Sequence, residues 1–178
     1  HLDATQGALA RLTAACGLAH RHGAAITALY AMPPSLAQMP YGPELGAGIA
    51  ATLMELDEQR RDATRQAFQQ FTCEVPVPVW AEATDAPVIR ALAQQALFAD
   101  LVVLGQRNPD DPVTSALPPD LAEAVVLSSG RPALLIPYVG APATLGQTVV
   151  VAWKETPEAA RALSAAMPIL QQAAAVHV

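Results

Sequence analysis

The stretch that decides the fold runs from residue 100 to residue 137. It opens with Asp100-Leu101-Val102-Val103-Leu104-Gly105, a short apolar strand that stops at a glycine. A polar, proline-rich loop follows over 106–119, and Asp120-Leu121-Ala122-Glu123-Ala124-Val125 has the pattern of a helix start. Ala133-Leu134-Leu135-Ile136-Pro137 is a second apolar strand. The order strand, loop, helix, strand is the layout that presents loops and helix N-termini to a phosphate.

Strand-like runs and helical stripes alternate through the preceding hundred residues as well. Residues 8–19 have helical spacing with Gly23 as the predicted C-cap, and 25–30 reads as a strand. Val77–Ala81 is a predicted strand whose flanking prolines suggest a sheet edge. This alternation predicts an α/β fold with a parallel sheet and helices on both faces.

Two further helices are predicted between these strands. The first is long and amphipathic, and Asp85 is the expected N-cap of the second. The predicted apolar face of the long helix is Ile49, Leu53, Leu56, Ala63, Ala67 and Phe71, and the inward side chains of the second are Val88, Ile89, Leu92, Ala96 and Leu97.

Composition excludes several classes of protein. The chain has 178 residues, of which 52% are apolar and 15% charged, as expected for a folded core. The net charge of −6 and the lack of a basic block argue against a nucleic-acid partner. No apolar run reaches the roughly 18–20 residues of a membrane span, so no membrane association is expected.

The two cysteines, Cys16 and Cys73, fall in separate predicted helices and have no metal-ligand spacing. They are expected to be buried, reduced thiols of a cytoplasmic protein, and a disulfide between them is the alternative left open. His20 and His22 are two residues apart on a helix and point to different sides, so no metal site is predicted.

The chain then begins to repeat itself. At an offset of 150, residues 1–28 can be laid on 151–178 without a gap, with the same layout of strand end, helix, turn and strand. This agreement predicts a tandem duplication. The predicted domains are 1–138, a linker at 139–147, and an incomplete second domain at 148–178.

The order and spacing of several fragments resemble the universal stress protein family. The fragments are Leu2-Asp3, Ala19-His20-Arg21-His22-Gly23-Ala24, Ala99-Asp100-Leu101-Val102-Val103-Leu104-Gly105, Leu121-Ala122-Glu123-Ala124-Val125 and Gly130-Arg131-Pro132-Ala133-Leu134-Leu135-Ile136-Pro137. The resemblance implies a three-layer, Rossmann-like or flavodoxin-like five-stranded parallel sheet in the order 3-2-1-4-5. It also implies a tandem-domain member of the family, with a homodimer or an intramolecular domain pair formed through strand 133–137.

Many members of this family bind ATP through Gly-x2-Gly-x9-Gly followed by Ser or Thr, because the glycines let the backbone approach the phosphates. Here only Gly105 survives, the second glycine falls on Asn108, and the last Gly-Ser pair falls on Pro119-Asp120. Pro119 has no N–H to offer, and Asp120 is expected to cap the next helix in place of a phosphate. The degenerate nucleotide site implied by the resemblance comprises Asp3, Leu104, Gly105, Asn108 and Asp120.

Asp3 matches the acidic residue at the end of the family's first strand, which often contacts the nucleoside. The competing interpretation is that it caps the following helix. Asp110 and Asp111 add negative charge near the place of a triphosphate.

Three functions remain open after this comparison. The favoured one is a binding or regulatory module for stress response that does not bind ATP in the family's usual way and needs no cofactor. The alternative is an ATP-binding sensor with its site in this or the second domain. An enzyme on the same fold ranks last, because no nucleophile, base or metal cluster is visible in the sequence.

Overall fold

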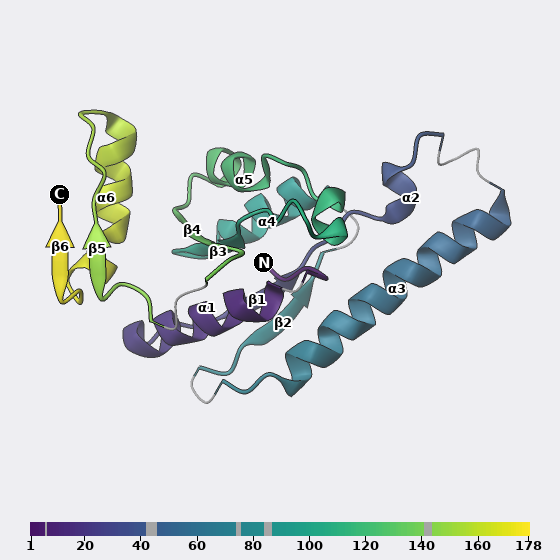
Figure 1. The fold of residues 1–178 in the computed structure, drawn as a ribbon, viewed down its shortest axis with the longest axis horizontal. Helices are drawn as coiled ribbons and strands as arrows, with labels where there is room; N and C mark the ends of the chain where they lie inside the picture. Colours follow the sequence, from purple (N-terminus) through teal and green to yellow (C-terminus); the bar gives the residue numbers. More distant parts are fainter. Residues whose placement is uncertain (6, 42–45, 74–75, 84–86, 141–143) are drawn as a thin grey trace.

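The structure is a computed structural model that describes residues 1–178 except 6, 42–45, 74–75, 84–86 and 141–143. Strands and helices alternate along the chain as predicted (Figure 1). The elements are α1 (Ala8–His22), β1 (Thr27–Tyr30), α2 (Ser35–Gln38), α3 (Ala47–Gln70), β2 (Val79–Glu82), α4 (Val88–Ala96), β3 (Val102–Gly105), the 3-10 helix η2 (Pro112–Ala116), α5 (Leu121–Ser129), β4 (Ala133–Ile136), β5 (Thr148–Val150), α6 (Pro157–Leu170) and β6 (Ala175–His177).

The described strands pair in parallel as β1 with β2, β3 with β4, and β5 with β6. Residues 1–3 lie between the first two pairs. The Leu2 N–H donates to the Leu29 carbonyl at 2.8 Å, and the Leu2 carbonyl accepts from the Ala31 N–H at 3.3 Å. On the other side, the His1 nitrogen donates to the Val103 carbonyl at 2.8 Å. The segment therefore joins the two strand pairs.

Two hydrophobic clusters fill the space around these strands. The larger cluster lies between β1, β3 and the helices α4 and α5, and Leu104 and Val125 are its most completely buried large side chains. The smaller cluster centres on Leu2 and Leu12 under α1. Tyr30 stacks on Trp80 with ring centroids 5.8 Å apart, so Trp80 is a packing residue.

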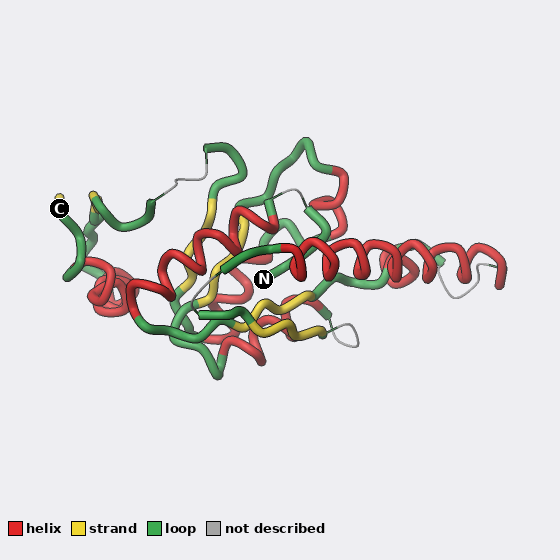
Figure 2. Tube along the Cα trace, turned by 90° about the horizontal axis from the view of Figure 1, so that it is seen from below, coloured by secondary structure: helices red, strands yellow, loops and turns green. Residues whose placement is uncertain are grey.

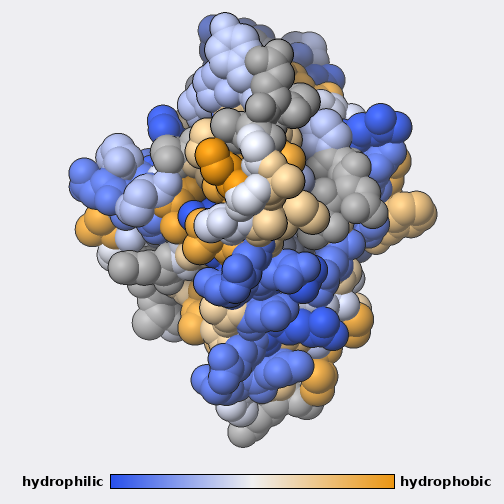
Figure 3. Space-filling model, turned by 90° about the vertical axis from the view of Figure 1, so that its right-hand side faces the viewer, coloured by the Kyte–Doolittle hydropathy of each residue, from blue (hydrophilic) through white to orange (hydrophobic). Residues whose placement is uncertain are grey.

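The long helix α3 packs differently from the prediction. Its C-terminal end lies beside the β1–β2 pair and the rest extends well beyond it (Figure 1), and none of its residues is buried. Ile49, Leu56 and Ala63, which were expected to face inward, are exposed. Leu53, Ala67 and Phe71 are half-buried, as predicted, and the half-buried face also includes Asp57 and Arg61. The outer surface of this helix forms a largely hydrophilic band (Figure 3).

Two helices end at a glycine with positive φ, and Gly23 was the predicted C-cap of the first. Gly23 ends α1 at φ 61°, with its N–H bonded to the Ala19 carbonyl, and Gly130 ends α5 at φ 65°. A residue with a side chain would be strained at either position. The expected cap Asp85 lies outside the described residues, and Leu97, which was expected to face inward from α4, is 53% exposed.

The prediction of two reduced thiols is wrong. Cys16 on α1 and Cys73, just after α3, form a disulfide with Cα atoms 6.3 Å apart. The sequence could not show this, because the pair meets only after the chain has passed through β1, α2 and α3. Cys73 also lies outside any helix, contrary to the prediction.

Residues 148–178 form a strand, a helix and a strand beside the end of α1 (Figure 1). Thr156 caps α6 by accepting from the Ala159 N–H at 3.3 Å. None of the described residues 148–178 is buried. Nothing tests whether this unit is the start of a second domain, so the predicted boundaries at 138 and 148 stay predictions.

Among the described residues, no helix is both long enough and apolar enough to cross a membrane.

Candidate functional site

A cavity of about 580 Å³ opens where residues 1–11, the segment after β3 and the end of β4 meet. This is the end of the sheet at which the carboxyl ends of the parallel strands lie. In open α/β sheets, ligands bind in the crevice outside those strand ends. The location is therefore the expected one for a binding site.

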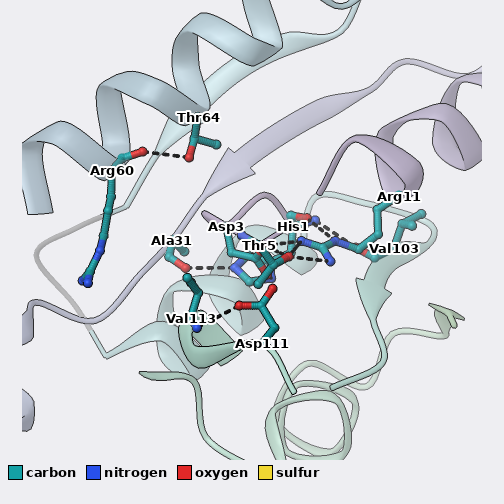
Figure 4. Close-up of polar contacts among 10 residues, drawn as sticks. All are labelled: His1, Asp3, Thr5, Arg11, Ala31, Arg60, Thr64, Val103, Asp111 and Val113. Carbon is teal, nitrogen blue, oxygen red and sulfur yellow. Dashed lines mark hydrogen bonds and ion pairs between the residues drawn. The ribbon is translucent and has the colours of Figure 1, made fainter. Parts of the chain in front are cut away.

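A buried ion pair forms one wall of this cavity. The Arg11 guanidinium donates to Asp3 Oδ1, and the side chains of the two residues are only 7% and 4% exposed. Arg11 Nε also donates to the His1 carbonyl at 3.1 Å, and Nη2 donates to Thr5 Oγ1 at 3.3 Å. Figure 4 shows the guanidinium surrounded by these partners. Since buried charges must be paired and fully bonded, this network holds Arg11 in one place.

Asp3 is organised by the same contacts. Its carboxylate accepts from the Thr5 N–H at 3.0 Å, as well as from the Thr5 hydroxyl and Arg11. His1 Nδ1 lies 3.7 Å from Asp3, while His1 Nε2 lies 2.8 Å from the Ala31 carbonyl. The interpretation of Asp3 as a helix cap is wrong, because Asp3 fixes a turn and an arginine, and α1 begins later with no side-chain cap. A contact with a nucleoside stays a prediction.

Two glycines make room for Arg11. A Cβ added to Gly105 would lie 2.4 Å from Arg11 Nη1, which is closer than such atoms come, and 3.0 Å from Arg11 Cδ, which is a tight contact. A Cβ on Gly7 would lie 3.3 Å from Nη1. The glycine that survives from the family's phosphate motif therefore contacts a guanidinium of the same chain.

The loop that follows β3 uses its N–H donors internally. Asp110 N–H donates to Asn108 Oδ1 at 3.1 Å, and Val113 N–H donates to Asp111 Oδ1 at 2.9 Å, which caps η2. Thr114 is buried, and its hydroxyl donates to the Asn108 and Asp111 carbonyls. Figure 4 shows the Asp111 cap next to the arginine network. Backbone donors bonded within the protein are those of Gln106, Asp111, Thr114, Leu117 and Leu121.

Prolines remove further donors from this segment. Residues 109, 112, 118 and 119 are all proline, and proline has no N–H. Phosphate-binding loops depend on several N–H groups that point into the site. This loop therefore supplies few of the groups that a triphosphate requires.

The structure brings together three of the five residues proposed from the sequence. Asp3, Gly105 and Asn108 line the cavity. Leu104 does not line it, because its side chain is 1% exposed and belongs to the larger hydrophobic cluster. Asp120 does not line it either, although its neighbours Pro119 and Leu121 do.

The predicted role of Asp120 is wrong. It stands at the N-cap position of α5, but its side chain makes no capping hydrogen bond. Its φ of −101° and ψ of 21° differ from the extended backbone that a capping residue normally adopts. The preceding Pro118-Pro119 pair restricts the chain at this point, and the carboxylate is left exposed.

Sequence reasoning missed Arg11, Thr5 and Thr114. One signal was available for Arg11. It stands on the apolar stripe of the first helix, beside Leu12 and one turn after Ala8, both of which are buried. A charged residue on a buried stripe requires a partner, and Asp3 is the nearest acidic residue before it. Thr114 gave no such signal.

The cavity is lined by the buried Arg11–Asp3 pair and by the hydroxyls of Thr5 and Thr114. Within the described ranges of the chain, no group of three or more His, Cys, Asp or Glu side chains could hold a metal ion. Thr5 and Thr114 both direct their hydroxyls to acceptors of the protein. The geometry is suited to binding and to holding the fold together.

Comparison with known proteins assigns a family to most of the chain. The model of the universal stress protein family matches residues 2–137. A solved structure, the universal stress protein UspA from Lactobacillus plantarum, is similar with a TM-score of 0.54 and 25% identity. The match covers 76% of this chain and 92% of that one. No curated protein matched.

Proposed function

Since this chain belongs to the universal stress protein family, we propose that it is a binding or regulatory module of the stress response whose first domain does not bind ATP in the family's usual way. It acts through contacts with partners rather than through catalysis, and needs no cofactor. The main competing function is that of an ATP-binding sensor, for which the cavity of about 580 Å³ beside Gly105 leaves space.

The observation that carries the proposal is the position of Arg11. Its guanidinium lies against Gly105 and is bonded by Asp3 and Thr5. A phosphate placed at Gly105 would have to displace this buried side chain and leave Asp3 unpaired, which is costly. Several loop donors that would offset that cost are already bonded within the protein, and proline removes four others.

Isothermal titration of the chain with ATP and Mg²⁺ tests the proposal. We expect no saturable heat in the micromolar range, and no nucleotide released from the purified protein on denaturation. The matched variant is N108G/P119G/D120S, which restores the residue types of the family motif. Binding that appears in this variant alone would identify the loop as the cause.

Micromolar binding by the wild-type chain would contradict the proposal. The variant R107A distinguishes ATP binding in the cavity from binding elsewhere, because Arg107 is exposed, lines the cavity and contributes a cation. If wild-type binding is weakened in R107A, the chain is an ATP-binding sensor with its site in this domain.

The proposal extends to assembly. The bonds from residues 1–2 to β1 and β3 support one five-stranded sheet in the order 3-2-1-4-5, with residues 1–3 as its central strand. β4 would then be the edge through which two domains pair. We further propose that 148–178 begins a second domain of the same kind, and that the protein acts in the cytoplasm without a nucleic-acid partner.

A further inference from the structure

The Cys16–Cys73 disulfide fastens the C-terminal end of α3, which few other contacts hold. We propose that it is a redox-responsive latch, opened by a dithiol, that controls whether the C-terminal end of α3 stays packed on the domain. The inference goes beyond the proposed function, because it concerns α3 and not the cavity, and only its compartment argument rests on the proposed function.

The first step is the weakness of the other contacts of α3. The helix has 24 residues and none is buried. Near its C-terminal end, Arg65 lies 3.6 Å from Glu82 in a partly exposed ion pair, which stabilises little. Phe68 contacts Trp80 with ring centroids 5.2 Å apart. The disulfide is the covalent link at this end.

The second step is the place of the disulfide in the packing. Cys16, Phe68 and Phe71 pack as half-buried side chains against the smaller hydrophobic cluster around Leu2 and Leu12. The bond therefore ties α1 to the point where the end of α3 meets that cluster. Without it, Phe68 and Phe71 would be held there by partial burial alone.

The third step is access. Cys73 is half-buried in coil after the helix, and Thr72 beside it is exposed. Cys16 is half-buried in the middle of α1. A thiolate of a dithiol can attack Cys73 Sγ and break the Sγ–Sγ bond, and Cys16 leaves as a thiolate that takes up a proton. The second thiol of the reagent then displaces Cys73, so the two electrons and two protons come from the dithiol.

The redox state of a reducing compartment favours a reversible disulfide over a permanent one. Disulfides in reducing compartments are uncommon, and those that occur are mostly catalytic or redox-sensing. For a protein proposed to act in the cytoplasm in a stress response, a bond that forms under oxidising stress and is cut by cellular dithiols has a direct use.

Trp80 provides the readout, because Phe68 covers it only while α3 is docked. The probe protein is the full chain with W153F, which leaves Trp80 as its one tryptophan. Folded protein is treated with dithiothreitol, alkylated with N-ethylmaleimide and weighed, while Trp80 emission and acrylamide quenching are recorded. We expect two labels, a red shift and stronger quenching, with the far-UV circular dichroism retained.

The variant C16A/C73A in the same background is the matched control. It should show the open-state emission of Trp80 with and without dithiothreitol. The latch would be overturned by free thiols in air-equilibrated protein, or by a bond that dithiothreitol cuts only after denaturation. It would also be overturned by unchanged Trp80 emission and quenching, or by loss of the whole fold on reduction.

Discussion

Arg11 and Gly105 are coupled at the scale of single residues, and a mutant cycle can measure the coupling. Gly105→Ala should destabilise the protein by about 1–3 kcal/mol, because the added methyl meets a guanidinium that its bonds hold in place. In an Arg11→Ala background, which itself costs about 3–5 kcal/mol by leaving Asp3 unpaired, the same change should cost almost nothing.

Gly17→Ala is the control for this cycle. Gly17 lies within α1, and an added Cβ there meets nothing within 4 Å, so the substitution should stabilise the helix by up to about 1 kcal/mol. Urea unfolding gives the free energies. An equal cost of Gly105→Ala in both backgrounds would mean that the glycine does not serve Arg11.

Tyr30 makes stability depend on pH in the alkaline range. Burial raises the pKa of Tyr30 to about 12, and nearby Asp57 contributes in the same direction. Between about pH 10 and pH 12, Tyr30 has lost its phenol proton in the unfolded chain and retains it in the folded chain. The contribution of Tyr30 to the free energy of unfolding is therefore fully present below pH 10. It falls as pH rises toward 12, by an amount on the order of 2 kcal/mol.

The variant Y30F isolates this effect. It should keep the fold, because the phenyl ring can still stack on Trp80, and it should flatten the decline in unfolding free energy between pH 10 and 12. A variant that declines as steeply as the wild type would assign the effect to other groups.

At the scale of elements, the order of helices and strands was predictable, and their edges and faces were less so. The predicted strand 77–81 forms as Val79–Glu82, because Pro76 and Pro78 delay pairing by removing N–H donors. The face of α3 was misread, because Asp57 lies inward to bind the Ser35 N–H and hydroxyl at 2.7 and 2.6 Å. Hydrophobic periodicity alone cannot reveal such an anchor.

The candidate site was also predictable only in part. Gly105 and Asn108 were found because they follow a strand in sequence, and they do line the cavity. The ring of contacts around Arg11 depends on residues that only the folded chain brings together. The disulfide escaped prediction because its two halves are 57 residues apart.

Because the two cysteines are far apart in sequence, removing the disulfide should lower the free energy of unfolding. A disulfide that closes a loop of 57 residues is expected to stabilise by about 4 kcal/mol through the entropy of the unfolded chain. C16A/C73A should lose an amount of this order in urea unfolding, and reduced wild-type protein should lose the same. A loss below about 1 kcal/mol in both would contradict the loop-closure account.

For the whole molecule, stability should be unevenly distributed along the chain. The described residues of 148–178 include none that is buried, whereas α4 alone buries Val88, Ala91, Leu92, Ala93 and Ala96. Hydrogen exchange followed by mass spectrometry should therefore show fast exchange in α6 and slow exchange in α4 and β3. Equal protection in both regions would mean that α6 is covered by a further partner.

Pairing of two copies through β4 can be tested at this scale as well. Leu135 on that strand is 45% exposed, and a lysine there should disfavour association along the edge. Light scattering after gel filtration should report twice 18.5 kDa for the wild type and the single mass for L135K. L127K is the control, since Leu127 on α5 is 85% exposed and away from that strand.

The division of strands β1 to β4 into two ladders also gives the molecule a mechanical direction. The β1–β2 and β3–β4 pairs are separate ladders (Figure 2). They are joined by backbone bonds of His1 and Leu2 and by the larger hydrophobic cluster between β1, β3, α4 and α5. A pulling force that separates the two pairs would load these backbone bonds and the contacts of that cluster first. Single-molecule stretching along that direction would then rupture the protein at this seam, at lower force than stretching along either ladder.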